Sequence, residues 1–144
     1  MVSPIPRKFP GIKLVWSEGG IGWIPYFLER ADRTYEMHST WTGQDFGGKL
    51  PSEVFREHFL TCFIDDAFGL KNIEMIGEDN IAYECDYPHS DTVWPESADR
   101  FMETVKHLSD EQIDKMFKDL STHWPTFDGF VHSIGYAPRE AIAG

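Results

Sequence analysis

The chain of 144 residues is long enough for one ordinary domain with a core. Its 41% of hydrophobic residues and five tryptophans favour a packed globular chain over a disordered one. The formal net charge of −11 argues against nucleic acid or an anionic membrane surface as a partner, which leaves a small molecule or another protein. The sequence has neither a membrane-spanning run of about 18 apolar residues nor an N-terminal apolar signal segment, so we expect a cytoplasmic protein.

Strand-like and helix-like segments alternate along the chain. Short apolar runs, most of them rich in branched and aromatic residues, predict buried strands at residues 12–16, 59–64, 81–85 and 130–134. Helices are predicted at residues 23–39, 53–58, 96–107 and 110–120, the last opened by a capping box of Ser109 and Gln112. Asp65 or Asp66 can cap one further helix, whose apolar face is formed by Phe68, Leu70, Ile73 and Ile76. This alternation predicts an α/β fold with a parallel sheet.

Two cysteines and three histidines fall inside predicted strands and helices. Cys62 and Cys85 are too few for a disulfide framework, and their apolar surroundings predict buried free thiols. His38, His58 and His107 lie on predicted helices, where we expect them to face solvent.

Polar residues follow three of the predicted strands, and the loops after strand ends carry the functional groups of α/β folds. These places are residues 17–20, 65–66 and 86–91. In the third, Asp86 precedes His89 by three residues, a pair that can hold a metal or act as acid and base. The alternative is a turn aspartate with an exposed histidine, and spacing alone favours that alternative.

Five segments resemble the amidohydrolase-related family, which includes aminocarboxymuconate-semialdehyde decarboxylase and related metal-dependent decarboxylases and hydrolases. They are Phe9–Pro25, Leu28–Asp32, Leu50–Glu53, Cys62–Asp66 and Asp79–Asp91. The resemblance begins near the sixth barrel strand and covers about residues 7–112. A complete (β/α)₈ barrel needs roughly 250 residues. The resemblance therefore implies a partial TIM barrel that contains only the last strands and helices.

The resemblance also implies roles for four residues. Asp86 is the aspartate at the end of barrel strand eight, which binds the divalent metal, zinc or manganese, or takes a proton from the metal-bound water. Glu18 stands where the decarboxylases have an acid/base histidine; it is a catalytic candidate, or a loop carboxylate that accepts bonds from neighbouring amides. His89 and Trp94 line the substrate mouth, or are exposed loop residues.

The metal ligands of the family are not all present in this sequence. The family's His-x-His pair and the histidine of a middle strand are absent. One aspartate cannot hold a catalytic divalent ion, because such sites need about three protein ligands. We therefore expect this chain to bind no metal and to be inactive alone.

The end of the chain resembles a second family. Residues Met116–Leu120 and Trp124–Pro138 are similar to bacterial enoyl-acyl-carrier-protein reductase, a nicotinamide-dependent Rossmann protein, with similarity over roughly residues 109–144. This resemblance implies a short Rossmann-like βα tail in which Ser133, Ile134 and Gly135 lie against the cofactor. A strand followed by a turn explains the same residues, and the glycine-rich phosphate loop is absent.

The two resemblances predict a barrel part at residues 1–112 and a reductase-like part at 113–144, with the boundary somewhere in 108–114. Our hypothesis is that two coding sequences were joined there, by recombination or by misassembly of the DNA. The predicted function is a fragment of a metal-dependent hydrolase or decarboxylase of a small carboxylate or amide-type substrate. The alternatives are a fragment of an NADH-dependent enoyl reductase, and a non-catalytic chimeric product. An opened barrel exposes strand edges, so we expect the chain to form a homo-oligomer or to aggregate.

Overall fold

The computed structural model describes residues 3–117. Three strands occur in this range: β1 (Leu14–Trp16), β2 (Phe59–Phe63) and β3 (Ile81–Tyr83). The helices are α1 (Ile5–Lys8), α2 (Ile24–Thr42), α3 (Pro51–His58), α4 (Ala67–Leu70), α5 (Ile73–Ile76), α6 (Ser97–Val105) and α7 (Asp110–Phe117), with a 3₁₀ turn η1 (Glu78–Asn80). The strand predicted at 130–134, and with it Ser133, Ile134 and Gly135, lies outside the described residues.

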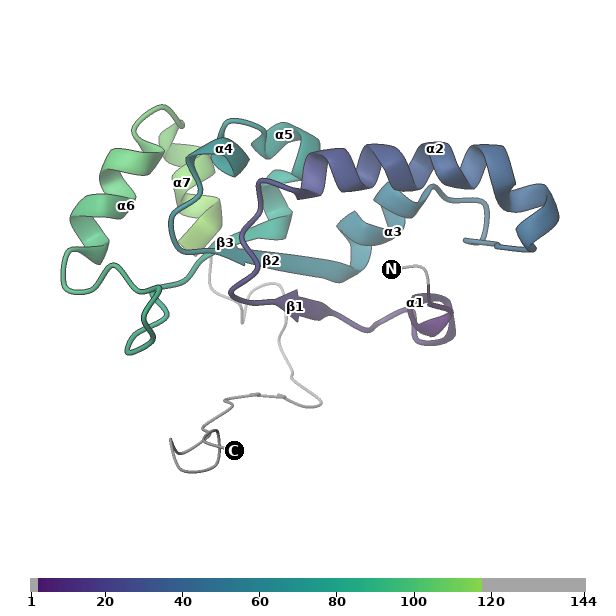
Figure 1. Ribbon diagram of the computed structural model, residues 1–144, viewed down its shortest axis with the longest axis horizontal. Coiled ribbons are helices and arrows are strands. Elements are labelled where there is room, and N and C mark those ends of the chain that lie inside the picture. The colour runs from purple at the N-terminus through teal and green to yellow at the C-terminus, as the bar shows by residue number, and fades with distance from the viewer. Residues whose placement is uncertain (1–2, 118–144) are drawn as a thin grey trace, which may run out of the picture.

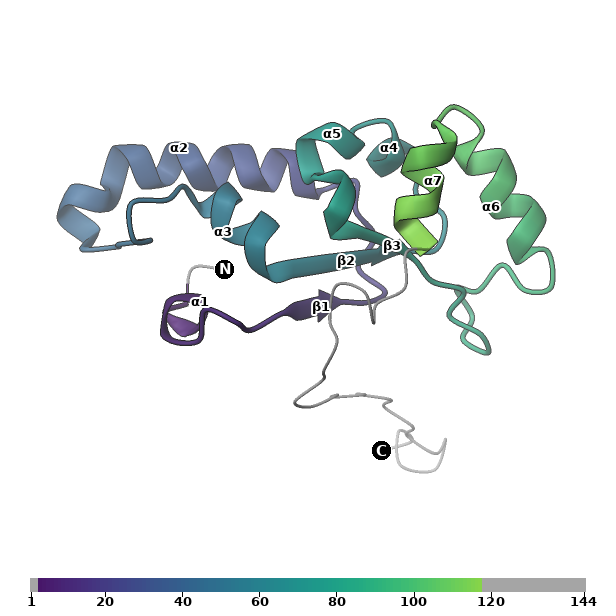
Figure 2. The same ribbon diagram turned by 180° about the vertical axis from the view of Figure 1, so that it is seen from behind.

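The three strands form one parallel sheet in the order β1-β2-β3. Trp16 pairs with Thr61 and Thr61 pairs with Ile81, so neighbouring strands in the sheet are also neighbours in sequence. Helices α2, α4 and α5 lie on one side of the sheet, as both ribbon views show (Figures 1 and 2). The predicted α/β fold with a parallel sheet is confirmed for this part of the chain.

The core lies between the sheet and these helices. Side chains alternate across a strand, so Phe59, Thr61 and Phe63 point to one face of β2 and are all buried. They meet aliphatic and aromatic side chains from the helices; the core members are Ile21, Ile24, Leu28, Phe55, Phe59, Phe63, Leu70, Ile73, Ile76, Ile81, Phe101 and Val105.

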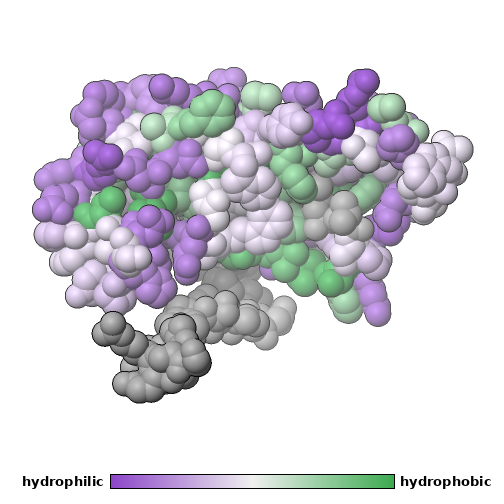
Figure 3. Space-filling model, viewed as in Figure 1, coloured by the Kyte–Doolittle hydropathy of each residue, from purple (hydrophilic) through white to green (hydrophobic). Residues whose placement is uncertain are grey.

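The opposite face of the sheet has no helical layer within residues 3–117. Val15 of β1 points to that face and is 47% exposed. Ile5 and Phe9 of the preceding segment are also exposed, and apolar side chains gather on the lower side of the molecule over α1 and β1 (Figure 3). Parallel sheets usually have both faces covered. At β1 the sheet therefore exposes apolar surface that a larger α/β domain would bury, whereas Cys62 on the same face of β2 is buried.

Two predictions about the helices are wrong in detail. The helix expected after Asp66 is divided into α4 and α5, because Asn72 leaves the helical conformation (φ −118°, ψ 22°), and its side chain, not its backbone N–H, donates to the Phe68 carbonyl oxygen (2.7 Å). Phe68 points outward and is 67% exposed, so it does not join the predicted apolar face. By contrast, the capping box is confirmed, with Ser109 and Gln112 exchanging hydrogen bonds at the start of α7.

His58 is a further correction. We expected it to face solvent, but it is 6% exposed and its Nδ1 lies 2.8 Å from the Ile12 carbonyl oxygen. This contact joins the end of α3 to the segment entering β1. Cys62 is buried as predicted, whereas Cys85 is only half-buried; both are free thiols. None of the helices in the described part is both long and apolar enough to cross a membrane.

Candidate functional site

The loops after β1 and β3 bring three of the predicted site residues together. Glu18 follows β1, and Asp86 and His89 follow β3. One ligand atom from each lies within 4.8 Å of the others. The carboxyl ends of parallel strands meet at one edge of a sheet, which explains how residues so far apart in sequence become neighbours.

Asp86 and His89 form the tightest contact in this group. The Asp86 Oδ1 atom lies 2.8 Å from the His89 Nδ1 atom, and the His89 backbone N–H donates to the Asp86 carbonyl oxygen within the same turn. The Asp86 side chain is 11% exposed, against 44% for His89. The carboxylate is therefore partly withdrawn from solvent, while the imidazole remains accessible.

The backbone at Glu18 and Asp86 is unusual in the same way. Their φ angles are 61° and 54°, and among residues 3–117 they are the non-glycine residues with positive φ. This left-handed region costs an L-residue roughly 1–2 kcal/mol. Residues in such conformations cluster at functional sites, where the surrounding structure holds them in place.

Glu84 holds the loop after β1, and no sequence pattern indicates this role. Its carboxylate accepts a hydrogen bond from the Glu18 backbone N–H (2.5 Å) and another from the Ser17 hydroxyl (2.6 Å). Its own backbone N–H donates to the Phe63 carbonyl oxygen, which continues the β2–β3 pairing by one residue. Glu84 thus connects the ends of all three strands beside the Glu18–Asp86–His89 cluster.

The aspartates after β2 do not join this cluster. Asp66 accepts hydrogen bonds from the backbone N–H groups of Ile21 (2.7 Å), Gly22 (2.6 Å) and Gly69 (2.8 Å). It therefore caps α4, as predicted, and binds the loop after β1. A Cβ atom at Gly22 would lie 3.0 Å from the Asp66 carboxylate, so a larger residue here would fit only if the Asp66 side chain shifted. Asp65 instead pairs with Arg100 at 2.8 Å.

A hollow of about 530 Å³ lies beside Glu18, at the end of β1. Its walls are formed by the strand end, the glycine loop and the first residue before α2; they are Val15, Trp16, Ser17, Glu18, Gly19, Gly20 and Trp23. Trp23 is held there because its indole N–H donates to the Gly19 carbonyl oxygen at 3.0 Å. The hollow has the size of a small-molecule site and contains one carboxylate, that of Glu18.

The model of the amidohydrolase family matches residues 1–119. The chain belongs to the amidohydrolase family. Two solved structures agree with this at the level of the fold. One is 5-carboxyvanillate decarboxylase LigW from Sphingomonas paucimobilis, with 21% identity and a TM-score of 0.58, which covers 81% of this chain. The other is the amidohydrolase map2389c from Mycobacterium avium subsp. paratuberculosis K-10, with 20% identity, a TM-score of 0.63 and 78% coverage of this chain.

This amidohydrolase chain spans 37% and 28% of those two structures. A short stretch also matches curated enoyl-[acyl-carrier-protein] reductases [NADH] FabI. The protein of Neisseria meningitidis serogroup B is 56% identical over 36 residues, and that of Salmonella typhimurium is 57% identical over 35 residues. These matches cover 25% and 24% of this chain, but only 14% and 13% of the reductases.

Trp94 is the remaining predicted site residue of the amidohydrolase part. It is 58% exposed, and its ring packs against Tyr87 with centroids 5.5 Å apart. It is not a member of the Glu18–Asp86–His89 cluster, although it belongs to the same loop. Its predicted contact with substrate stays a prediction.

The pKa values of the two thiols, Cys62 and Cys85, are shifted in opposite directions. Burial raises the pKa of Cys62 to about 11, so it stays protonated at neutral pH. Hydrogen bonds from Ser97 and Thr92 to the Cys85 sulfur lower the pKa of Cys85, which directly precedes Asp86. The sequence predicted two equivalent buried thiols, and the structure distinguishes them.

Proposed function

We propose that this chain supplies the strand-six to strand-eight side of the active site of a metal-dependent hydrolase or decarboxylase with a partial (β/α)₈ fold. The observation that carries the proposal is the cluster of Glu18, Asp86 and His89 at the carboxyl ends of β1 and β3. Membership of the amidohydrolase family supports it, and so does the place of the cluster, because barrel active sites lie at that end of the strands. The substrate class that we propose is a small carboxylate or amide.

The residues present fit a divalent metal ion. Two carboxylates and one imidazole make three protein ligands, the number that catalytic zinc sites use, and the same donor types suit manganese. The sequence alone predicts Asp86 as the one metal ligand of this chain; the ligand atoms of Glu18, Asp86 and His89, which lie within 4.8 Å of one another, support the proposal that all three hold the ion. A bound ion would supply Lewis-acid activation of a substrate oxygen or of water.

The protein groups around the cluster have separate roles in this proposal. Asp86 and His89 would hold the ion through the two atoms that now contact each other, Oδ1 and Nδ1. Glu18 would hold the ion or take a proton at its carboxylate. Glu84 positions Glu18 through the loop backbone, and the hollow beside Glu18 would receive the substrate.

Titration of the purified chain with Mn²⁺ and with Zn²⁺ in a calorimeter tests the proposal. We expect saturable binding of one ion, and at least about tenfold weaker binding after Asp86→Ala, because one of three ligands is lost. Asp91→Ala is the matched control, since Asp91 is an exposed aspartate of the same loop and is outside the cluster. Absence of binding, or equal weakening by both substitutions, would show that the chain has no metal site of its own.

The reductase match favours a second proposal for the end of the chain. We propose that residues 113–144 derive from an enoyl reductase gene, joined to the amidohydrolase part within 108–114, with Ser133, Ile134 and Gly135 as the former cofactor contacts. The identity of 56% over 36 residues supports this origin. Single long sequencing reads across the junction should contain both parts without interruption. If no such read exists, the junction is an assembly error.

NADH fluorescence should not change on addition of the chain, because the phosphate loop is absent from the sequence.

A further inference from the structure

The hollow at the end of β1, which we call the β1 hollow, has acidic surroundings. Among the described residues that line it, Glu18 has the one charged side chain. Residues 14–23 and 81–99, which include β1, β3 and the loops that follow them, contain no lysine or arginine. Arg100 comes directly after the second range, and it is paired with Asp65 at 2.8 Å. The hollow therefore has no basic side chain that would attract a ligand carboxylate.

A divalent ion in the proposed metal cluster would leave negative charge beside the β1 hollow. Glu18 and Asp86 belong to the cluster, and the Glu84 carboxylate accepts the Glu18 backbone N–H at 2.5 Å. These three carboxylates carry three formal negative charges, one more than a divalent ion neutralises. Negative charge around a hollow concentrates cations and repels anions. A positively charged ligand group is therefore favoured there over a negatively charged one.

The loop after β1 uses several of its hydrogen-bond donors within the chain. Their acceptors are the Glu84 and Asp66 carboxylates and the Gly19 carbonyl oxygen. The donors are the Ser17 hydroxyl, the backbone N–H groups of Glu18, Ile21 and Gly22, and the Trp23 indole N–H. A ligand carboxylate accepts hydrogen bonds and so competes with these internal acceptors for donors. The Glu18 carboxylate is itself an acceptor, and it suits a ligand that donates.

Two indole rings form an aromatic wall of the β1 hollow. Trp16 and Trp23 both line it, and their rings stack with centroids 5.7 Å apart and an interplanar angle of 29°. Trp23 is 43% exposed, and its N–H is bound to the Gly19 carbonyl oxygen. It therefore offers ring surface to a ligand and not a hydrogen-bond donor. Cations bind to the faces of aromatic rings, and tryptophan binds them best.

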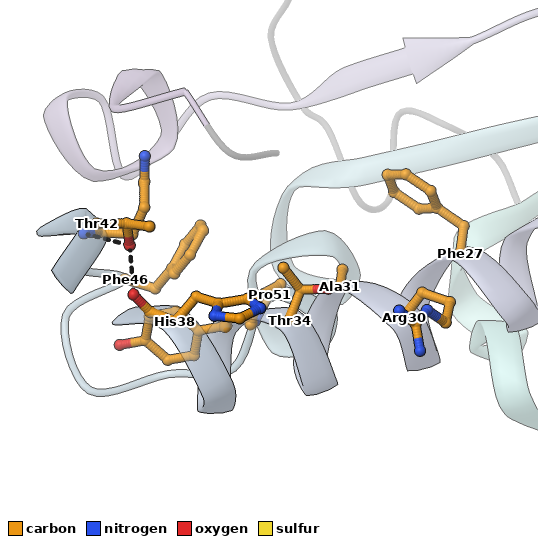
Figure 4. Close-up of a pocket in the computed structure, with 10 residues that line it drawn as sticks. Phe27, Arg30, Ala31, Thr34, His38, Thr42, Phe46 and Pro51 are labelled. Atoms are coloured by element: carbon orange, nitrogen blue, oxygen red, sulfur yellow. Dashed lines mark hydrogen bonds between the residues drawn. The ribbon is translucent and has the colours of Figure 1, made fainter. Parts of the chain in front are cut away.

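A second hollow has a different charge character. This groove of about 360 Å³ lies between α2 and the segment that leads into α3 (Figure 4). Among the described residues that line it are Arg30 and His38, but no aspartate or glutamate. Acidic surroundings are therefore not common to every hollow of this acidic chain.

We propose that the β1 hollow binds an organic ammonium group, between the Glu18 carboxylate and the Trp23 ring. This inference rests on the proposed function and narrows its substrate class to a carboxylate or amide that also carries a protonated amine. The ammonium N–H would donate a charge-assisted hydrogen bond to Glu18, while its positive charge lies over the indole ring. The Glu18 carboxylate has two oxygen atoms, so it can contact both the metal cluster and the hollow.

NMR titration of the full, metal-free chain at neutral pH tests the proposal with three probes of similar shape. The probes are benzylammonium, benzamide and benzoate. We expect benzylammonium to bind at least about tenfold more tightly than benzoate, with benzamide between them, because of the charge-assisted hydrogen bond and the cation–π contact. Absence of benzylammonium binding at millimolar concentrations would overturn the proposal. So would equal or tighter binding of benzoate, which would assign ligand binding to the backbone N–H groups of Gly19 and Gly20.

Two glutamine substitutions show whether the charge of Glu18 is responsible. Glu18→Gln should weaken benzylammonium binding at least about fivefold and change benzamide binding by less than about twofold, because it removes a charge with almost no change in shape. Glu29→Gln is the matched control, since Glu29 is exposed on α2 and does not line the hollow. It should leave both affinities unchanged. Equal weakening by the two variants would overturn the proposal, because overall net charge would then explain the binding.

Substitutions of Trp23 test the aromatic contact separately. Trp23→Phe keeps an aromatic face, whereas Trp23→Leu keeps only apolar volume, so benzylammonium should bind more tightly to the first variant. Equal binding by the two variants would overturn the assigned place of the ammonium group. Far-UV circular dichroism should show that all variants keep their helices.

The metal-free titration separates this inference from the proposed function. A chain that binds no Mn²⁺ or Zn²⁺ in the calorimeter but prefers benzylammonium would refute the metal site and leave the ammonium site. A chain that binds metal but prefers benzoate would refute the ammonium site alone. Addition of Zn²⁺ should preserve the preference for benzylammonium, because the three carboxylates exceed the charge of the ion.

Discussion

Glu18 and Asp86 share a backbone conformation that costs free energy, and both belong to the same three-residue cluster. At Glu18 the left-handed conformation is maintained by Glu84, which accepts the Glu18 backbone N–H. A glycine would adopt the same φ of 61° without steric cost. The presence of glutamate at this position therefore needs a reason other than stability, and the proposed metal or proton-transfer role provides one.

We expect a substitution at Glu18 to change the stability of the chain and its metal binding in opposite directions. The substitution Glu18→Gly should raise the free energy of unfolding by about 0.5–1 kcal/mol, because relief of the left-handed strain exceeds the entropic cost of glycine. The same variant should bind Mn²⁺ more weakly. Urea unfolding followed by fluorescence measures the first effect, and calorimetry measures the second. A variant that is less stable than the wild type would indicate that the Glu18 side chain has a structural role instead.

Among the elements, the loop after β1 depends most strongly on one side chain from elsewhere. Asp66 accepts three backbone N–H groups, two from that loop and one from α4. Its neighbour Asp65 makes only an ion pair with Arg100, whose side chain is 58% exposed. The two adjacent aspartates therefore have very different structural importance.

The comparison of two alanine substitutions tests this difference. Asp66→Ala leaves three partly buried donors without their acceptor and should lower the free energy of unfolding by about 2–4 kcal/mol. Asp65→Ala removes a solvent-exposed ion pair and should cost no more than about 1 kcal/mol. Urea denaturation of both variants gives the two values directly. Equal effects would mean that the hydrogen bonds of Asp66 contribute no more than a surface ion pair.

The elements that the sequence predicted well are those whose signal is local. The three strands of the sheet and the capping box at α7 follow from runs and spacings within a few residues. The division of the predicted helix at Asn72 is a local failure, but two other features that the sequence missed involve partners distant in sequence. His58 binds a carbonyl oxygen 46 residues away, and Glu84 binds a backbone amide 66 residues away, which no periodicity within a helix or strand can reveal. The positions after predicted strands already marked Glu18 and Asp86 as candidates, and the family resemblance added the roles expected of them.

At the scale of the molecule, residues 3–117 place helices on one face of the sheet and no helix on the other (Figures 1 and 2). In the described residues, helices pack against the face that includes Phe59 and Phe63, while Val15 on the other face is 47% exposed. The chain covers 37% of the decarboxylase structure to which it is similar in fold. The face of Val15 corresponds in our proposal to the inside of a barrel, where the remaining strands would bury it. Its exposure is therefore a property of this chain that stability measurements can detect.

Valine-to-threonine substitutions compare the two environments with almost no change in shape. Val15→Thr should change the free energy of unfolding by less than about 0.5 kcal/mol, because the new hydroxyl group meets water and threonine is a good strand residue. Val105→Thr, at a fully buried position of α6, should cost about 1–3 kcal/mol, because its hydroxyl group is taken from water into the apolar core. Urea unfolding at one low protein concentration keeps self-association from contributing. A large cost at Val15 would mean that the face is covered in solution, and repetition over a range of protein concentrations would show whether a second copy covers it.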